Sequence, residues 1–151
     1  MWRVANAADD QAIVSMFMAL NAEDPGPVSV QPEQMRRTLA TLREQPWRGR
    51  AMVCAIDGQV VGYALLISFW SNEFGGEACS IDELFVVPEH RGSSLATSLI
   101  ESLADRRQTL WPASQPALVF EVTPQNQRAI ALYRRLGFRG ENLALRRPVP
   151  D

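Results

Sequence analysis

Residues 81–96, with the sequence IDELFVVPEHRGSSLA, hold the pattern that decides the fold. A run rich in β-branched and aromatic residues ends at Pro88, and it predicts a strand over residues 80–87. From Ser94 onward apolar residues recur every three or four positions, which predicts an amphipathic helix over residues 94–107. The segment therefore predicts a strand that leads almost directly into a helix.

The turn before this helix has the properties of an anion site. The first N–H groups of a helix lack acceptors and carry a partial positive charge, which favours a group such as a pyrophosphate. Small side chains let a phosphate approach the backbone closely, and four lie in or beside this turn: Gly92, Ser93, Ser94 and Ala96. The sequence lacks Gly-Lys-Ser/Thr and Gly-x-Gly-x-x-Gly, so P-loop and dinucleotide-binding turns are not expected.

Toward the N-terminus, residues 51–56 and 59–69 are separated by Asp57-Gly58, a pair typical of a two-residue type I′ hairpin turn. Three more elements are predicted upstream: a strand over residues 2–5, a helix capped by Asp9 or Asp10, and a helix that begins near Pro32. Toward the C-terminus the pattern predicts a buried strand over 117–123, a helix over 125–136 that Gly137 ends, and a strand over 139–147.

The predicted element order is β-α-α-β-β-β-α-β-α-β. This order is typical of an α/β (α+β) domain with a mixed, mainly antiparallel sheet flanked by helices. A chain of 151 residues, 46% hydrophobic and 21% charged, is expected to form one domain over residues 1–151.

Composition excludes several functional classes. A net charge of −2 argues against nucleic-acid binding, and the longest apolar stretch, residues 60–67, is too short for a membrane span. The N-terminus has no hydrophobic signal core, so we expect a cytoplasmic protein. Cys54, Cys79 and the single histidine, His90, are too few for a disulfide scaffold or a multi-histidine metal site, and no metal is expected.

The charges are unevenly distributed along the chain. All fifteen basic residues are arginines, six of them within residues 128–147. Residues 71–89 hold five acidic residues and no basic one: Glu73, Glu77, Asp82, Glu83 and Glu89. These two regions are either two solvated faces, or an acidic pocket for a cation and a basic region near an anion.

Two segments resemble the signatures of the GCN5-related N-acetyltransferase (GNAT) superfamily. Residues 91–96, RGSSLA, are similar to its acetyl-CoA motif Arg/Gln-x-x-Gly-x-Gly/Ala, with Ser94 in place of the middle glycine. Residues 84–88 resemble the fourth strand of the family, whose backbone pairs with the pantetheine arm. Residues 126–138 match every named position of the second signature, Asn-x-x-Ala-x-x-x-Tyr-x-x-x-Gly-Phe.

The resemblance implies a fold, a co-substrate and a set of site residues. It implies a GNAT-like domain that binds acetyl-CoA, in an assembly compatible with a homodimer. The residues expected to bind acetyl-CoA are Phe85, Val86, Val87, Arg91, Gly92, Ser93, Ser94, Leu95, Ala96, Asn126 and Tyr133. Tyr133 stands where the family commonly places a tyrosine near the sulfur, so it is either the proton donor to the leaving thiolate or a core aromatic.

Three carboxylates are candidates for the group that deprotonates the amine. Asp82 and Glu83 rank first, and strand alternation is expected to place them on opposite faces. Glu121 ranks next, because its spacing to Tyr133 resembles the protein N-terminal acetyltransferase branch. His90 is expected to be solvated or to pack in the loop. Trp70 is a candidate for the wall of an acceptor pocket, and Trp47 either lines that pocket too or covers the core edge.

The function expected from these residues is acetyl transfer from acetyl-CoA to a primary amine by direct attack. The acceptor is expected to be a small, cationic molecule, because the region before the motif is acidic and residues 69–84 resemble diamine and small-amine acetyltransferases. Two alternatives stay open: acetylation of a protein N-terminus or side chain, and a non-catalytic acyl-CoA-binding module.

Overall fold

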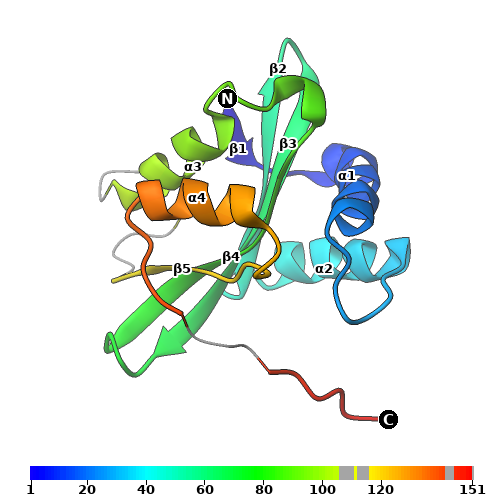
Figure 1. Ribbon diagram of the computed structural model, residues 1–151. Coiled ribbons are helices and arrows are strands. Elements are labelled where there is room, and N and C mark those ends of the chain that lie inside the picture. The colour runs from blue at the N-terminus through cyan, green and yellow to red at the C-terminus, as the bar shows by residue number, and fades with distance from the viewer. Residues whose placement is uncertain (106–110, 112–115, 142–144, 151) are drawn as a thin grey trace.

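A five-stranded sheet forms the centre of the computed structural model, with helices on both of its faces (Figure 1). The structure describes residues 1–105, 111, 116–141 and 145–150. The strand order is β1-β2-β3-β4-β5; neighbours are antiparallel from β1 to β4, and β5 is parallel to β4. The strands are β1 (Trp2–Val4), β2 (Gly49–Ile56), β3 (Gln59–Ser71), β4 (Gly76–Val86) and β5 (Leu118–Phe120). The expected mixed, mainly antiparallel sheet is confirmed.

The β2–β3 hairpin forms as its turn residues predict. Asp57 and Gly58 have φ values of 49° and 80°. Positive φ at both central positions defines a type I′ turn, whose twist matches that of the flanking strands. The turn aligns Ile56 with Gln59 and so sets the register of the two central strands.

Two layers of helices cover the sheet, and each closes its own core cluster. On one face α1 (Asp10–Glu23) and α2 (Pro32–Glu44) pack over a cluster that includes Val53, Tyr63 and Phe85. On the other face α3 (Leu95–Ala104) and α4 (Gln127–Arg135) pack over a cluster that includes Leu66 and Ile81. Two short 3₁₀ turns, η1 (Ala7–Asp9) and η2 (Pro88–His90), complete the described elements.

The start of α1 differs from the expected aspartate cap. Asp9 occupies the N-cap position, but its side chain makes no capping hydrogen bond to α1. Its buried carboxylate instead accepts from the Asn6 N–H at 2.8 Å and from both terminal nitrogens of Arg3 at 2.8 Å. The Asp9 carboxylate, which was expected to cap α1, therefore forms an ion pair with Arg3 on β1 instead.

Several helices and strands end at residues other than those predicted. The helix expected to reach residue 107 ends at Ala104, and residues 106–107 lie outside the described part of the chain. The strand expected over residues 117–123 is limited to β5, and α4 begins at Gln127. The strand expected over 139–147 is wrong for its described residues, 139–141 and 145–147, while 142–144 lie outside the description. Leu145 is 90% exposed, so the described part of this tail has no apolar burial to hold it on the sheet.

Candidate functional site

Pairing between the two parallel strands stops before β4 ends, and we call the space beside the unpaired edge of β4, beyond the end of β5, the opening. Pairing of β4 with β5 ends at Ile81 and Phe120, whereas β4 continues to Val86. Within the described residues, nothing pairs with the outer edge of β4 over residues 82–86. The opening is therefore bounded by a free strand edge on one side and by the end of β5 on the other.

The peptide groups of Leu84 and Val86 face this opening. The Val87 N–H donates to the Val61 carbonyl on β3 at 2.9 Å. Because peptide groups alternate in direction along a strand, Phe85 and Val87 hydrogen-bond toward β3, and Leu84 and Val86 point the other way. The Val86 carbonyl accepts from Arg91 Nε at 2.8 Å, which leaves the two N–H groups and the Leu84 carbonyl for a ligand.

The turn at the end of β4 has an unusual backbone. Gly92 has a φ of 79°, and Ser94, at the N-cap of α3, has φ 63° and ψ 19°. A side chain in this left-handed region costs on the order of 1 kcal/mol, which explains why a glycine is usual at the position of Ser94 in the family motif. The Trp2 indole donates to the Leu95 carbonyl at 2.8 Å and anchors the first turn of the helix.

Substitution of Ser94 tests this turn. Ser94→Gly is expected to leave the fold unchanged and to raise the melting temperature by a few degrees, because it relieves the left-handed strain. Ser94→Leu is expected to abolish binding of coenzyme A, measured by calorimetry, since its side chain would crowd the first N–H groups of α3. Unchanged affinity of the leucine variant would place the anion site elsewhere.

Glu83 lies beside the opening, on the face that α1 and α2 cover. A β-bulge lies between the Leu65–Glu83 and Leu66–Ile81 pairs, so Asp82 is an extra residue in β4. The bulge resets the alternation: Ile81 packs in the cluster under α3 and α4, whereas the Glu83 carboxylate accepts from the Tyr63 hydroxyl at 3.0 Å on the other face. Burial raises the pKa of Glu83 to about 7.

Asp82 and Glu121 belong to a second, more exposed group of charges. Partial burial raises the pKa of Asp82; the Glu121 carboxylate raises it further, and Arg146 opposes both effects. Glu121 follows β5 directly, is exposed, and pairs with Arg146. Three carboxylates thus gather at the opening, and Glu83 is the least exposed of them.

Tyr133 lies across the sheet from Glu83, in the cluster under α3 and α4. It is 7% exposed, and its ring centroid is 3.9 Å from that of Phe120, the last residue of β5. Among the described residues its hydroxyl has no hydrogen-bond partner. Burial raises the pKa of this phenol well above its usual value, so it stays protonated.

The end of α1 bridges the two sides of the opening, a feature that the sequence did not predict. Glu23 accepts from Arg91 through both carboxylate oxygens at 2.9 Å. Asp24 accepts from the Thr123 hydroxyl, beyond β5, at 3.1 and 3.2 Å. These partners are 68 and 99 residues apart in sequence, so no local pattern could have found them.

The remaining predicted site residues have structural partners or lie on the surface. Asn126 caps α4 by accepting from the Ala129 N–H at 3.1 Å, and His90 lies in η2. The Arg91 guanidinium also lies 5.2 Å from the centre of the Phe85 ring, so this side chain is held by protein groups. Trp47 and Trp70 are 70% and 65% exposed.

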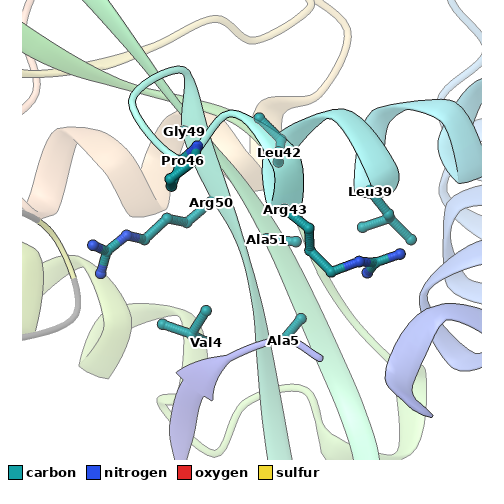
Figure 2. Close-up of a pocket in the computed structure, with 9 residues that line it drawn as sticks. All are labelled: Val4, Ala5, Leu39, Leu42, Arg43, Pro46, Gly49, Arg50 and Ala51. Carbon is teal, nitrogen blue, oxygen red and sulfur yellow. The ribbon is translucent and has the colours of Figure 1, made fainter. Parts of the chain in front are cut away.

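A separate cavity of about 400 Å³ lies between α2, β1 and β2 (Figure 2). Its walls include Leu39, Leu42 and Ala51, and Arg43 at its rim pairs with Asp10 at 2.7 Å. None of the predicted catalytic or coenzyme-binding residues lines it.

The described residues contain no helix long and apolar enough to cross a membrane. In the same part of the chain, no three His, Cys, Asp or Glu side chains gather as metal ligands would. Both cysteines are buried and free, and burial raises the pKa of Cys79 to about 12.

Known proteins resemble this chain in sequence. The sequence model of the acetyltransferase (GNAT) family matches residues 14–138. An uncharacterized N-acetyltransferase of Methanocaldococcus jannaschii is 32% identical over 87 residues, which cover 57% of this chain and 37% of that protein. The mycothiol acetyltransferase of Amycolatopsis mediterranei is 33% identical over 91 residues, 50% of this chain and 29% of that protein. The matched region therefore spans about a third of the length of these relatives.

Solved structures extend the likeness to the whole fold. The structure of a possible acetyltransferase from Clostridium difficile 630 superposes with a TM-score of 0.78 at 17% identity, covering 100% of this chain and 97% of that one.

Proposed function

The chain belongs to the GNAT family of acetyltransferases, and on that premise we propose that it moves an acetyl group from acetyl-CoA to a primary amine. One observation carries the proposal. The half-buried carboxyl of Glu83, with a pKa of about 7, and the buried phenol of Tyr133 lie on opposite faces of the sheet, beside the opening between β4 and β5. A thioester held in that opening would have a base on one side and a proton donor on the other.

The residues at the opening fit acetyl-CoA as co-substrate, which members of this family generally use. The outward peptide groups of Leu84 and Val86 offer a strand edge to the amide groups of pantetheine. The turn from Gly92 to Ala96 and the N-terminus of α3 offer N–H groups to the pyrophosphate. Because the Arg91 side chain is already bound by Glu23 and Val86, we assign its contribution to holding the turn in shape.

Glu83 is proposed as the base. An alkyl ammonium has a pKa near 10.4 and cannot attack until it loses a proton. A carboxylate whose pKa is about 7 accepts that proton far more readily than an ordinary carboxylate does, and it is half ionised near neutral pH. The neutral amine nitrogen then forms a bond to the thioester carbonyl carbon, and a backbone N–H at the open edge of β4 can stabilise the oxyanion.

Tyr133 is proposed as the donor to sulfur. When the C–S bond breaks, the phenol gives its proton to the departing thiolate, and the second proton of the amine nitrogen restores the phenol. The products are the acetylated amine and coenzyme A, and the proton held by Glu83 passes to solvent. The unpartnered hydroxyl of Tyr133 is available for this task, because no described side chain competes for it.

The acceptor is proposed to be a small cationic amine. Asp24, Asp82, Glu83 and Glu121 place carboxyl groups around the opening, and among the described residues Arg146 acts against them. The other acidic residues of the 71–89 segment lie elsewhere, since Glu77 is bound by Ser68 at 2.8 Å and Glu89 lies in η2. The group of carboxylates at the opening therefore comes from three separate segments of the chain rather than from one acidic run.

An acceptor series with matched size and different charge tests this proposal. Thiol release from acetyl-CoA is expected to be faster with diamines than with neutral monoamines, and slowest with amines that carry a carboxylate. Added salt should raise the acceptor KM for diamines, because screening weakens their attraction to the carboxylates.

The same series separates the alternatives. Faster turnover with acidic acceptors would overturn the proposal that the acceptor is cationic. Turnover with peptides alone would favour a protein acceptor. Retention of coenzyme A without thiol release from any amine would identify a binding module instead of an enzyme.

A further inference from the structure

We propose that Tyr63 is a positioning residue that holds the Glu83 carboxylate in the orientation needed to accept a proton from the amine. The proposal rests on the function proposed above, in which Glu83 is the base. Tyr63 lies outside both signature segments, and its role comes from the contact alone.

The contact is produced by strand register. Tyr63 is paired with Phe85 on β4, and the next residue on that face of β4 is Glu83, opposite Leu65. Tyr63 and Glu83 are thus diagonal neighbours, a separation that a tyrosine side chain spans. Its hydroxyl donates to Glu83 Oε1 at 3.0 Å. The register is regular from the Tyr63–Phe85 pair to the Leu65–Glu83 pair, and the bulge at Asp82 begins only beyond Glu83, so ordinary strand alternation brings the two side chains to the same face.

Tyr63 is more deeply buried than the group it contacts. Its side chain is 0% exposed, and its ring lies 6.3 Å from the Phe85 ring in the cluster that α1 and α2 cover. Within the described residues, its hydroxyl is the hydrogen-bond partner that the structure gives to Glu83. One carboxylate oxygen is therefore fixed by a buried donor, and the other is left to the acceptor amine.

The charges around Glu83 are consistent with one carboxylate oxygen bound to Tyr63 and the other left to the amine. Burial and the neighbouring Asp82 raise the pKa of Glu83, whereas the Tyr63 hydrogen bond lowers it. Glu121 and Arg146 act on Asp82, and the α1 carboxylates, Glu23 and Asp24, are bound by Arg91 and Thr123. Burial and the Glu83 charge raise the pKa of Tyr63 itself, so it remains a donor throughout the working pH range.

Tyr63→Phe removes the donor and keeps the ring. The pH profile of kcat/KM for an amine acceptor is expected to keep its shape, but its acidic limb should move about one unit to higher pH, the scale of one hydrogen bond to a charged group. Activity should fall about tenfold below the midpoint and recover at alkaline pH. An acidic limb that stays in place would overturn the proposal.

Leu65→Val is the matched control, since it removes a methylene beside Glu83 without touching a polar group. It is expected to lower the melting temperature and to leave the acidic limb in place. A shift as large as that of Tyr63→Phe would mean that packing, not the hydrogen bond, sets the pKa.

A measurement on the unmodified protein keeps the test independent of folding and of turnover. The chain has two tyrosines, so labelling tyrosine Cζ with carbon-13 gives two NMR signals, and Tyr133→Phe assigns them. The Tyr63 signal should titrate with the same midpoint as the Glu83 carboxyl carbon. A Tyr63 signal that does not follow this titration would overturn the contact. Full activity of Glu83→Gln would overturn the proposed base and with it the positioning role, and would leave the Tyr63–Glu83 contact standing.

Discussion

Tyr133→Phe is expected to lower kcat by about 10²- to 10⁴-fold with the best amine, the range typical of a lost general acid. The substitution removes one oxygen and keeps the ring against Phe120, so the fold and the affinity for coenzyme A should survive. The loss should appear in kcat more than in the acceptor KM, because the hydrogen bond strengthens as the thiolate forms.

Phe138→Leu provides the control for packing around Tyr133. The Phe138 ring lies 5.8 Å from that of Tyr133 and carries no proton to donate. Its replacement should reduce stability and change kcat far less. Near-normal turnover of Tyr133→Phe would show that the phenol serves packing and that the thiolate takes its proton from water.

Glu83→Gln is expected to lower kcat/KM near pH 7.5 by about 10²- to 10⁴-fold as well, and to remove the acidic limb of the pH profile. In the unmodified protein, activity should rise with pH through about 7 as Glu83 loses its proton. The glutamine variant should lack that limb, because it has no carboxyl to titrate. A pH profile that keeps its midpoint in Glu83→Gln would assign the limb to another group, with Asp82 the next candidate.

The same variant should be more stable than the unmodified protein in alkaline solution, which separates lost chemistry from lost folding. The pKa of Glu83 is raised in the folded state from 4.5 to about 7. The folded protein therefore loses stability as pH rises between these values, by about 3 kcal/mol at most. Glutamine avoids this cost and can still accept from Tyr63, so thermal unfolding at pH 8 should occur at a higher temperature in Glu83→Gln.

Local sequence determined much of the fold. The Asp57-Gly58 turn, the proline at the first position of α2, and the small turn before α3 each act over a few neighbouring residues, and each forms as predicted. The strand predicted over residues 139–147 shows the limit of local patterns, since a strand forms only where a neighbouring strand pairs with it. The described residues of this segment are not in a strand, and Leu145 is exposed.

The site depended on interactions that no local pattern shows. Alternation alone would place Ile81 and Glu83 on one face, but the bulge at Asp82 separates them onto opposite faces. The Tyr63 contact follows from that register, and the partners of Arg91 and Thr123 come from the distant end of α1. The sequence therefore identified the reactive residues, and the tertiary structure assigned the environment of each.

Amide hydrogen exchange with and without acetyl-CoA tests most directly where the co-substrate binds. The Leu84 and Val86 N–H groups face the opening, and the first N–H groups of α3 lack intrahelical acceptors, so all of them should exchange readily in the free protein. We expect acetyl-CoA to slow exchange at Leu84, Val86 and residues 92–97 together, and to leave the amides around the α2 cavity unchanged (Figure 2). Protection confined to that cavity, or no protection along β4, would contradict the placement of the reaction between β4 and β5.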